Sequence, residues 1–504
     1  MKKIKALAIV FFITLLLFSA CNRGGAVQTG AARDTVTMAS PTDIESMDPQ
    51  FANNLVSMRL VTQIFDTLTR TSPTGENRLW LAESYEVIND GLSYVFTLRR
   101  GVRFHNGDEL KASDVAFTVQ RGMSSPFAGA IFGAVSGAEA LNDYQVRIDL
   151  KFAYAPFLFA MSTPLSSIVS ERAVMEAGDE FFRRPVGTGA YRFVSWEPGN
   201  RVILEAFDDW HGGKVPIKNL VFRVLPDPTT SVIALERGEV DMLLETPMTE
   251  RAQILKNPNL RLYDVASHRF YYLGFNTMSP HFSDRRVREA VARTIDREGM
   301  RIVASEGTGF LAQNHLAPTL FGFAPSVTWY ERDIEAARRL MQEAGKTGMN
   351  VRLIAMDGPA ARAAQVTQDN LKEIGITANI EILERAALIE AGQRGTFDLM
   401  VHAWSTPVPD ADYTVNFLFR SSMIRAMNNS FYNSPKIDAL ILQGAMQRDP
   451  NDRIETYRQI TELLKYDLPS IPIYFEMVSL AAHKDLRGVV ASPSSTYYFY
   501  ELSW

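Results

Sequence analysis

The chain has 504 residues, a formal net charge of −5, and a composition of 46% hydrophobic and 22% charged residues. This length predicts about three domains, and the composition is that of a globular protein, which excludes disordered and collagen-like chains. No segment carries a dense run of lysine and arginine. Because a nucleic-acid-binding protein needs a concentrated basic surface, we expect no nucleic acid as a partner.

The first residues have the pattern of an export signal. Three lysines within the first five residues precede an apolar run over 6–20, which is too short to span a membrane comfortably. Residues 17–21, Leu-Phe-Ser-Ala-Cys, resemble the lipobox of bacterial lipoproteins, which implies cleavage before Cys21 and acylation of its thiol. We therefore expect a signal peptide over 1–20 and a lipidated, flexible tether over 21–33. A lipid on Cys21, rather than a helix, would hold the exported protein to the cell membrane or the outer membrane.

The rest of the chain alternates between the patterns of strands and helices. Hydrophobic residues alternate over 94–98 and again over 146–150, which predicts strands and a strand-rich region in the N-terminal third. Hydrophobic residues spaced three and four apart predict one helix that starts at Asp284 and another over 333–345.

A strand–helix–strand unit is predicted next. Residues 351–355 and 376–382 alternate as strands, and the segment from about 360 to 374 has a helical pattern. Two strands joined in this way by a helix are expected to be parallel. A late helix is predicted from Asp452 until Pro469 stops it. The pattern as a whole predicts an α/β protein with a smaller, strand-rich insertion.

No pattern indicates catalysis or metal binding. The seven histidines are scattered without an HExxH or other short metal-binding spacing, and no GxSxG nucleophile motif occurs. Residues 187–189 lack the third glycine of a dinucleotide loop, and residues 345–347 follow a helix, whereas a phosphate loop precedes one. We predict no catalytic residues, no metal and no cofactor.

Several motifs in order along the chain resemble one known family. The longest is GLSYVFTLRRGVRFHNG over 91–107, followed by Ala-Ser-Asp-Val over 112–115. Further matches lie at 46–49, 185–193, 275–276 and 284–290. Together they resemble the family 5 extracellular solute-binding proteins, the peptide, nickel and opine receptors of bacterial ABC importers. Within these motifs we expect His105 and Asp114 to shape the fold rather than to bind ligand.

The resemblance implies a two-lobed periplasmic binding protein fold of the large, type II peptide-binding class, with an extra strand-rich subdomain. The implied boundaries are 34–76, 185–265 and 480–504 for lobe one, 77–184 for the inserted subdomain, and 266–479 for lobe two. Ligand would bind between the lobes and favour their closure, and a membrane permease with ATPase subunits on the cytoplasmic side would accept it. We expect the receptor to be a monomer.

The ligand segment of the family corresponds to residues 397–412, in which Trp404 matches the family's tryptophan. The aspartate that holds a peptide ammonium in well-known members corresponds here to Pro407, which supplies neither a charge nor an amide hydrogen. Asp410 or Asp412 could substitute for it, or the ligand has no free ammonium. The alternative for both aspartates is a solvated turn or a helix cap.

Other candidates also follow from the resemblance. Arg362 corresponds to one member of an arginine pair that contacts the ligand carboxylate in dipeptide receptors, the alternative being an exposed helix arginine. Residues 52–55 occupy the place where family members contact the ligand backbone. Trp404 could wall the cleft or pack in the core. The predicted ligand-binding residues are Trp404, Ser405, Asp410, Asp412, Arg362, Asn53, Asn54 and Leu55.

The leading functional hypothesis is a lipid-anchored receptor for oligopeptides or dipeptides. Pro407 keeps open a receptor for a different solute, such as an opine-like conjugate, an oligosaccharide or chelated nickel. A secreted hydrolase whose catalytic groups converge only in three dimensions is a further alternative, and it would turn its substrate over. A surface adhesin is favoured only if no small molecule stabilises the protein.

Overall fold

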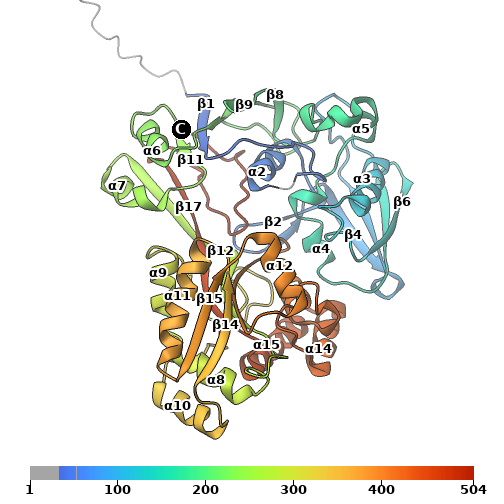
Figure 1. Ribbon diagram of the computed structural model, residues 1–504. Coiled ribbons are helices and arrows are strands. Elements are labelled where there is room, and N and C mark those ends of the chain that lie inside the picture. Colours follow the sequence, from blue (N-terminus) through green and yellow to red (C-terminus); the bar gives the residue numbers. More distant parts are fainter. Residues whose placement is uncertain (1–32, 53) are drawn as a thin grey trace, which may run out of the picture.

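The computed structural model describes residues 33–52 and 54–504. The predicted signal peptide, Cys21 and almost all of the predicted tether lie outside the described residues. Figure 1 shows two lobes, one above the other, with a strand-rich region beside the upper one. The long strands β12 (Leu260–Phe275) and β17 (Ser470–His483) run from the upper lobe into the lower one and pair with each other.

One eleven-stranded sheet runs through both lobes. Its lower-lobe strands are β15 (Ile376–Ile382), β14 (Met349–Ala355) and β16 (Leu399–Ser405), which lead to β12 and β17. Its upper-lobe strands are β11 (Met242–Leu243), β1 (Thr35–Ser40), β10 (Asn219–Val224), β9 (Arg201–Ala206) and β8 (Tyr191–Glu197). A short strand, β13 (Phe310–Leu311), pairs with β17 beside this path. The lobes are therefore connected by shared strands, so a change in their relative position requires β12 and β17 to bend.

The pairing of β12 with β17 is interrupted where the strands pass between the lobes. Ala266 lies opposite Met477, and the next aligned pair is Phe270 with Phe475. Three residues of β12, at 267–269, therefore face the single residue Glu476 of β17. Such a bulge bends a strand and disrupts its pairing locally, so this is the position at which we expect the two strands to hinge.

The lower lobe confirms the predicted strand–helix–strand unit. Strands β14 and β15 are parallel, and α11 (Pro359–Lys372) connects them. The predicted helices are also present, as α8 (Arg285–Thr294) and α10 (Ile334–Glu343). Each begins after an aspartate whose side chain accepts a backbone hydrogen bond, Asp284 from Arg286 and Asp333 from Ala336. These caps satisfy amides that a helix start leaves unpaired.

The late helix α15 (Pro450–Asp467) begins two residues earlier than predicted. The carboxylate of Asp449 accepts hydrogen bonds from the amides of Asn451 and Asp452. Proline at the first helical position needs no amide partner and already has a helical φ, so Asp449 and Pro450 form the stronger start signal. The helix ends at Asp467, and its C-cap residue Leu468 directly precedes Pro469, where the sequence predicts the stop.

The strand-rich region is a four-stranded antiparallel sheet. Its order is β4 (Ala82–Ile88), β5 (Ser93–Leu98), β7 (Gln145–Leu150) and β6 (Val135–Asn142), which confirms the two predicted strands. Helix α3 (Ala112–Ser124) packs on this sheet, and Asp114 accepts a hydrogen bond from the Lys111 amide at the helix start. The ring of His105 lies 3.0 Å from the Gly189 carbonyl oxygen and packs edge-on against Phe207. Both side chains thus have structural partners.

The remaining helices lie around these sheets (Figure 1). They are α2 (Leu55–Ile64), α4 (Phe157–Ala160), α5 (Glu171–Ala177), α6 (Pro228–Glu236), α7 (Arg251–Lys256), α9 (Arg297–Ala304), α12 (Arg385–Arg394), α13 (Ala411–Phe419) and α14 (Pro435–Met446). Helix α14 packs against α13 and α15 at the side of the lower lobe. Within residues 33–52 and 54–504, none of the helices has the length and apolar character needed to cross a membrane. Separate hydrophobic cores form in the upper lobe, the strand-rich region and the lower lobe. The lobe boundaries given above remain a prediction.

Candidate ligand-binding cleft

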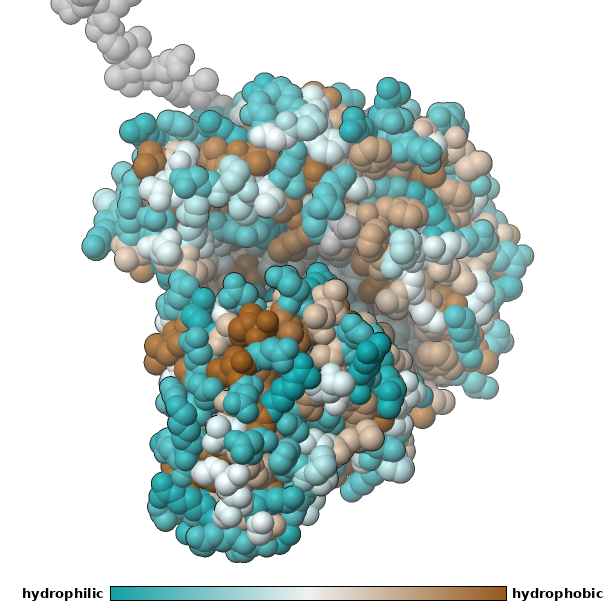
Figure 2. Space-filling view, in the orientation of Figure 1, coloured by the Kyte–Doolittle hydropathy of each residue, from teal (hydrophilic) through white to brown (hydrophobic). Residues whose placement is uncertain are grey.

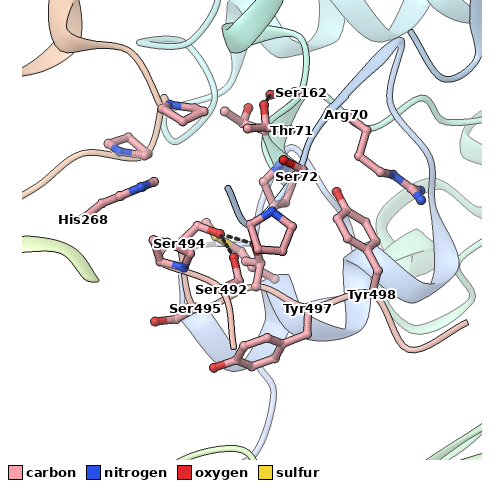
Figure 3. A pocket seen from close by; sticks show the side chains of 18 of the residues that line it. Arg70, Thr71, Ser72, Ser162, His268, Ser492, Ser494, Ser495, Tyr497 and Tyr498 are labelled. Carbon is pink, nitrogen blue, oxygen red and sulfur yellow. Dashed lines mark hydrogen bonds between the residues drawn. The ribbon is translucent and has the colours of Figure 1, made fainter. Parts of the chain in front are cut away.

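A cavity of about 650 Å³ lies between the two lobes. Figure 2 shows the hollow between them, and Figure 3 shows part of its lining. The upper side is formed by the start of α2, the hairpin of β2 (Thr69–Thr71) and β3 (Asn77–Leu79), the loop at 162–165, and the C-terminal segment 488–501. The lower side is formed by the bulge at 267–269, the loop at 405–409, and Glu476. Both lobes and the bulged strands between them therefore contribute to one cavity.

Several hydroxyl groups line the upper wall. Ser494 lies 2.9 Å from Ser492 and 2.8 Å from Thr496, so their side-chain oxygens form a chain (Figure 3). Elsewhere on the upper wall, the hydroxyl of Thr71 lies 2.7 Å from that of Ser162. A hydroxyl both donates and accepts hydrogen bonds. This wall can therefore pair with carbonyl and amide groups of a ligand without requiring a particular side chain.

A buried arginine supports the wall beside these hydroxyls. The guanidinium of Arg70 lies between the rings of Trp80 and Tyr498, at 3.7 and 4.0 Å, and forms a 2.6 Å ion pair with Asp66. Burial raises the pKa of Asp66, but the hydrogen bond from His211 and the charge of Arg70 outweigh it and hold that pKa below its usual value. The charge of Arg70 is thus already neutralised by a carboxylate.

The lower wall carries an ion pair on the two hinge strands. The Arg269 guanidinium lies 3.3 Å from the Glu476 carboxylate, and their side chains are 47% and 37% exposed. The neighbouring His268 is buried, and its backbone amide donates to the Pro493 carbonyl in the C-terminal segment. Its ring lies 2.9 Å from the Thr319 hydroxyl. Burial lowers the pKa of His268 to about 4, so its ring is neutral near pH 7.

Three of the sequence-predicted ligand residues line the cavity: Asn54, Leu55 and Ser405. The side chain of Asn54 caps α2 by accepting a hydrogen bond from the Ser57 amide at 2.7 Å. Asn53 lies outside the described residues. Pro407 also lines the cavity, so the position that the resemblance assigns to the ammonium-binding aspartate carries no charge there.

The two aspartates suggested as replacements do not line the cavity. Asp410 is fully buried, caps α13, and forms a 2.9 Å ion pair with Arg453. Asp412 is also buried and accepts a 3.1 Å hydrogen bond from the Tyr154 hydroxyl. Burial and the nearby charge of Asp410 raise the pKa of Asp412 to about 7. Asp410 is therefore a helix cap, which is one of the two alternatives given above. The other alternative, a solvated turn, is wrong, because both carboxylates are buried.

Trp404 and Arg362 also lie outside the cavity lining. The Trp404 ring packs near Tyr413 and Phe417, at centroid distances of 5.9 and 6.2 Å, against the core of the lower lobe. Arg362 donates to the Ala304 carbonyl at 2.6 Å and pairs with Glu306 at 3.4 Å. In this structure both residues link neighbouring elements of the lower lobe.

Sequence reasoning missed most of the upper wall and the hinge pair. The wall includes the segment Ser-Pro-Ser-Ser-Thr-Tyr-Tyr at 492–498, whose small hydroxyl residues followed by aromatic ones form an unusual tract near the end of the chain. No pattern in the neighbouring sequence identifies Glu476 as a cavity residue, because its position depends on the register of β17 against β12. Across the described residues, no group of three or more His, Cys, Asp and Glu side chains is arranged to hold a metal ion.

Comparison with known proteins gives consistent matches over most of the chain. The model of bacterial extracellular solute-binding proteins, family 5 (middle), matches residues 77–424. The glutathione-binding protein GsiB of Salmonella choleraesuis (strain SC-B67) is 28% identical over 484 residues, covering 93% of this chain and 94% of that protein.

Two solved structures share the two-lobed fold. HbpA2 from Haemophilus parasuis is 25% identical with a TM-score of 0.88, covering 93% of this chain and 99% of that one. DppA from Helicobacter pylori, in complex with the peptide STSA, is 26% identical with a TM-score of 0.76, covering 94% and 98%. Because the family model alone matches more than half of its length, the chain belongs to the family 5 bacterial extracellular solute-binding proteins.

Proposed function

We propose that this protein is the receptor subunit of an ABC importer that captures peptides in the cavity between its lobes. The observation that carries the proposal is the cavity itself, which has walls from both lobes and the hinge and is rich in hydroxyl groups. Its volume of about 650 Å³ lies within the range of about 300–1,000 Å³ common for ligand pockets. The similar proteins named as binding glutathione or a peptide support this ligand class.

The cavity suits a ligand with repeated amide groups. A buried amide without a partner costs free energy, so each one needs a hydrogen bond in the cleft. The hydroxyls of Ser492, Ser494, Thr496 and Thr71 can supply such bonds whatever the peptide side chains are. This arrangement favours broad recognition of short peptides.

Capture would involve closure of the lobes. In this proposal residues 34–76, 185–265 and 480–504 move against residues 266–479, with 77–184 as an added subdomain. The bulge between Ala266 and Phe270 would absorb the rotation. A ligand that contacts both walls binds the closed form more tightly and so increases its population, and the permease, with its cytoplasmic ATPase subunits, would accept that form.

The proposal includes the cellular setting. The export signal over 1–20 and acylation of Cys21 would place the receptor outside the cytoplasm, tethered by lipid to a membrane. The receptor would act as a monomer and would return its peptide intact, without catalysis.

The experiment is a melting-temperature measurement on residues 22–504, unfolded and refolded to remove bound ligand. The panel contains di- to pentapeptides, their N-acetylated forms, oligosaccharides and nickel–histidine. A ligand at 100 times its Kd adds about 2.7 kcal/mol to the free energy of unfolding, which is a shift of a few degrees. A shift with peptides supports the proposal, and recovery of the peptides unchanged supports a receptor rather than a hydrolase. A shift only with a sugar or nickel–histidine would overturn the peptide assignment.

A further inference from the structure

A second pocket, of about 530 Å³, lies on the upper lobe, away from the lower one. It is found where the first residues of β12 pair with the last residues of β17. Its lining includes Arg261 and Tyr263 of β12, Lys484 and Arg487 of the segment after β17, and Trp504. The pocket therefore belongs to one lobe, and its shape does not depend on closure of the two lobes.

The side chains of this pocket carry an excess of positive charge. Its charged residues are Arg261, Lys484 and Arg487, with Asp485 as the carboxylate. Within the part of the chain that the structure describes, none of the three cations forms an ion pair with a carboxylate side chain. Lys484 donates instead to the side-chain oxygen of Asn259 at 2.8 Å. The pocket thus presents cations that ion pairing does not neutralise, although the net charge of the chain is −5.

The backbone holds the wall of the pocket in place. The Arg487 amide donates to the Ser503 carbonyl at 2.8 Å, and the Ser503 amide donates back to Arg487 at 3.2 Å. At Gly488, where φ is +75°, a side chain would meet the carbonyl oxygen of Glu501 at 2.2 Å. Only glycine permits this close approach. Gly488 also contributes to the cavity between the lobes, so the chain at this point lies between the two spaces.

The first described residue lies beside this pocket. The Arg33 guanidinium is 4.0 Å from the centre of the Trp504 ring, and the Trp504 indole donates to the Thr35 carbonyl at 3.3 Å. Figure 1 marks the C-terminal end of the chain close to β1. The twelve residues 21–32 precede Arg33, and a chain of that length spans about 40 Å when extended and about 20 Å on average when flexible. A lipid on Cys21 would therefore keep this pocket near a membrane.

We propose that this pocket binds the phosphate of an anionic phospholipid headgroup and so turns the upper lobe toward the membrane that holds the tether. The inference goes beyond peptide binding and rests on the tether proposed above. A phosphate diester accepts hydrogen bonds, which the guanidinium groups of Arg261 and Arg487 donate in pairs and the ammonium of Lys484 donates as a point charge. Trp504 and Tyr263 suit the same boundary, because amphipathic rings favour the level of the headgroups.

The tether is the reason for choosing a membrane over a soluble phosphate compound. Each lysine or arginine close to an anionic membrane surface strengthens binding about fivefold, so three of them together give about 100-fold. Such an interaction is weak for a molecule that diffuses freely. A bilayer held within about 40 Å presents its headgroups at a high effective concentration, and the three cations are then sufficient to orient the lobe.

The test measures co-sedimentation of residues 22–504 with vesicles of phosphatidylcholine, with and without one third of phosphatidylglycerol, at low and high salt. The wild type is expected to bind only the anionic vesicles and to be released by high salt. The triple variant Arg261→Gln, Lys484→Gln, Arg487→Gln is expected to bind them about 10- to 100-fold more weakly, and each single variant about fivefold more weakly. Unchanged melting temperatures will show that the variants are folded.

A matched control is the triple variant Arg237→Gln, Arg339→Gln, Lys436→Gln, which removes the same charge from exposed positions outside the pocket. It is expected to change the affinity for vesicles by less than about threefold. An equal loss in both triple variants, or a wild type that does not bind anionic vesicles, would overturn the inference. Calorimetric binding of inorganic phosphate without binding to vesicles would also overturn it and would assign the pocket to a soluble anion.

The affinity for peptides separates this inference from the proposed function. The pocket variants are expected to bind tripeptides as tightly as the wild type does, because their substitutions lie outside the cavity between the lobes. Loss of vesicle binding with peptide binding retained is the result expected for the triple variant. A wild type that binds anionic vesicles but no peptide would overturn the proposed function and leave this inference in place.

Discussion

The Nη2 atom of Arg453 lies 2.9 Å from Oδ2 of Asp410, and both side chains are almost completely buried. The same guanidinium donates to the Gly444 carbonyl at 2.8 Å and to the Tyr457 hydroxyl at 2.9 Å. The charge of Asp410 thus joins α13 to α15 inside the lower lobe. A carboxylate used in this way is unavailable to a ligand in the cavity.

The variant Asp410→Asn is expected to be strongly destabilised without a change in ligand preference. It leaves the Arg453 charge buried and uncompensated, which typically costs about 3–5 kcal/mol of unfolding free energy. Urea denaturation followed by circular dichroism measures this loss. The control Glu390→Gln breaks an exposed ion pair with Arg394 and should cost less than about 1 kcal/mol. A stable Asp410→Asn protein with lost peptide binding would contradict this assignment.

Asp412 is expected to make stability fall as the pH rises. Its pKa is about 7 in the folded protein, against an ordinary value of 3.8, because burial and the charge of Asp410 disfavour ionisation. Between pH 4 and 7 the folded protein keeps a proton that the unfolded chain has released, so this contribution is full below pH 4 and lost by about pH 7.

The variant Asp412→Asn isolates that effect because its side chain is neutral at every pH. The amide can still accept the hydrogen bond from the Tyr154 hydroxyl that Asp412 accepts now. The stability of the variant relative to the wild type should increase from pH 4 to pH 7 and then level off, as measured by urea denaturation at several pH values. A difference that does not vary with pH would show that Asp412 is ionised throughout.

Two buried histidines should produce the opposite trend in acid. Burial lowers the pKa of His268 to about 4 and that of His315 to about 3, against 6.5 when unperturbed. The unfolded chain binds protons at these positions below pH 6.5 while the folded protein does not, so their contribution is full above pH 6.5 and is lost as the pH falls. Replacing His315 by Gln should therefore reduce the proton uptake on unfolding at pH 5, measured by calorimetry in buffers of different ionisation enthalpy. Unchanged proton uptake would contradict this.

Trp404 is expected to act through packing. The variant Trp404→Ala loses the contacts with Tyr413 and Phe417, and for this partly buried side chain the cost should be about 2–4 kcal/mol. The affinity of the remaining folded protein for peptides should be unchanged, because the indole does not line the cavity. Calorimetry at a temperature where the variant is fully folded separates the two effects, and a large loss of affinity there would assign Trp404 to the ligand site.

The sequence predicted the helices and strands whose signals lie within a few neighbouring residues. The helix capped by Asp284 and the strand–helix–strand unit around α11 follow from hydrophobic spacing and from end signals within a few residues. The predicted start of α15 lies two residues late, because the stronger signal of Asp449 and Pro450 precedes the residue that the prediction uses. Local patterns also predicted the strands at 94–98 and 146–150.

The site was less accessible to sequence reasoning because its geometry depends on distant partners. The role of Asp410 depends on Arg453, 43 positions later. The cavity brings Asn54 and Leu55 together with residues near the C-terminus. The charged pair at Arg269 and Glu476 exists because of a register shift between two strands, which no periodicity of either strand alone reveals.

Peptides are proposed to bind in the cavity between the lobes. The most direct measurement is isothermal titration of a tripeptide into ligand-free wild type and into Ser494→Trp, which places a large ring on an exposed position of the cavity wall. The control Glu335→Trp places the same ring on α10, outside the cavity. We predict one peptide per wild-type or Glu335→Trp molecule and a large loss of affinity in Ser494→Trp. Equal binding by all three proteins would contradict the account.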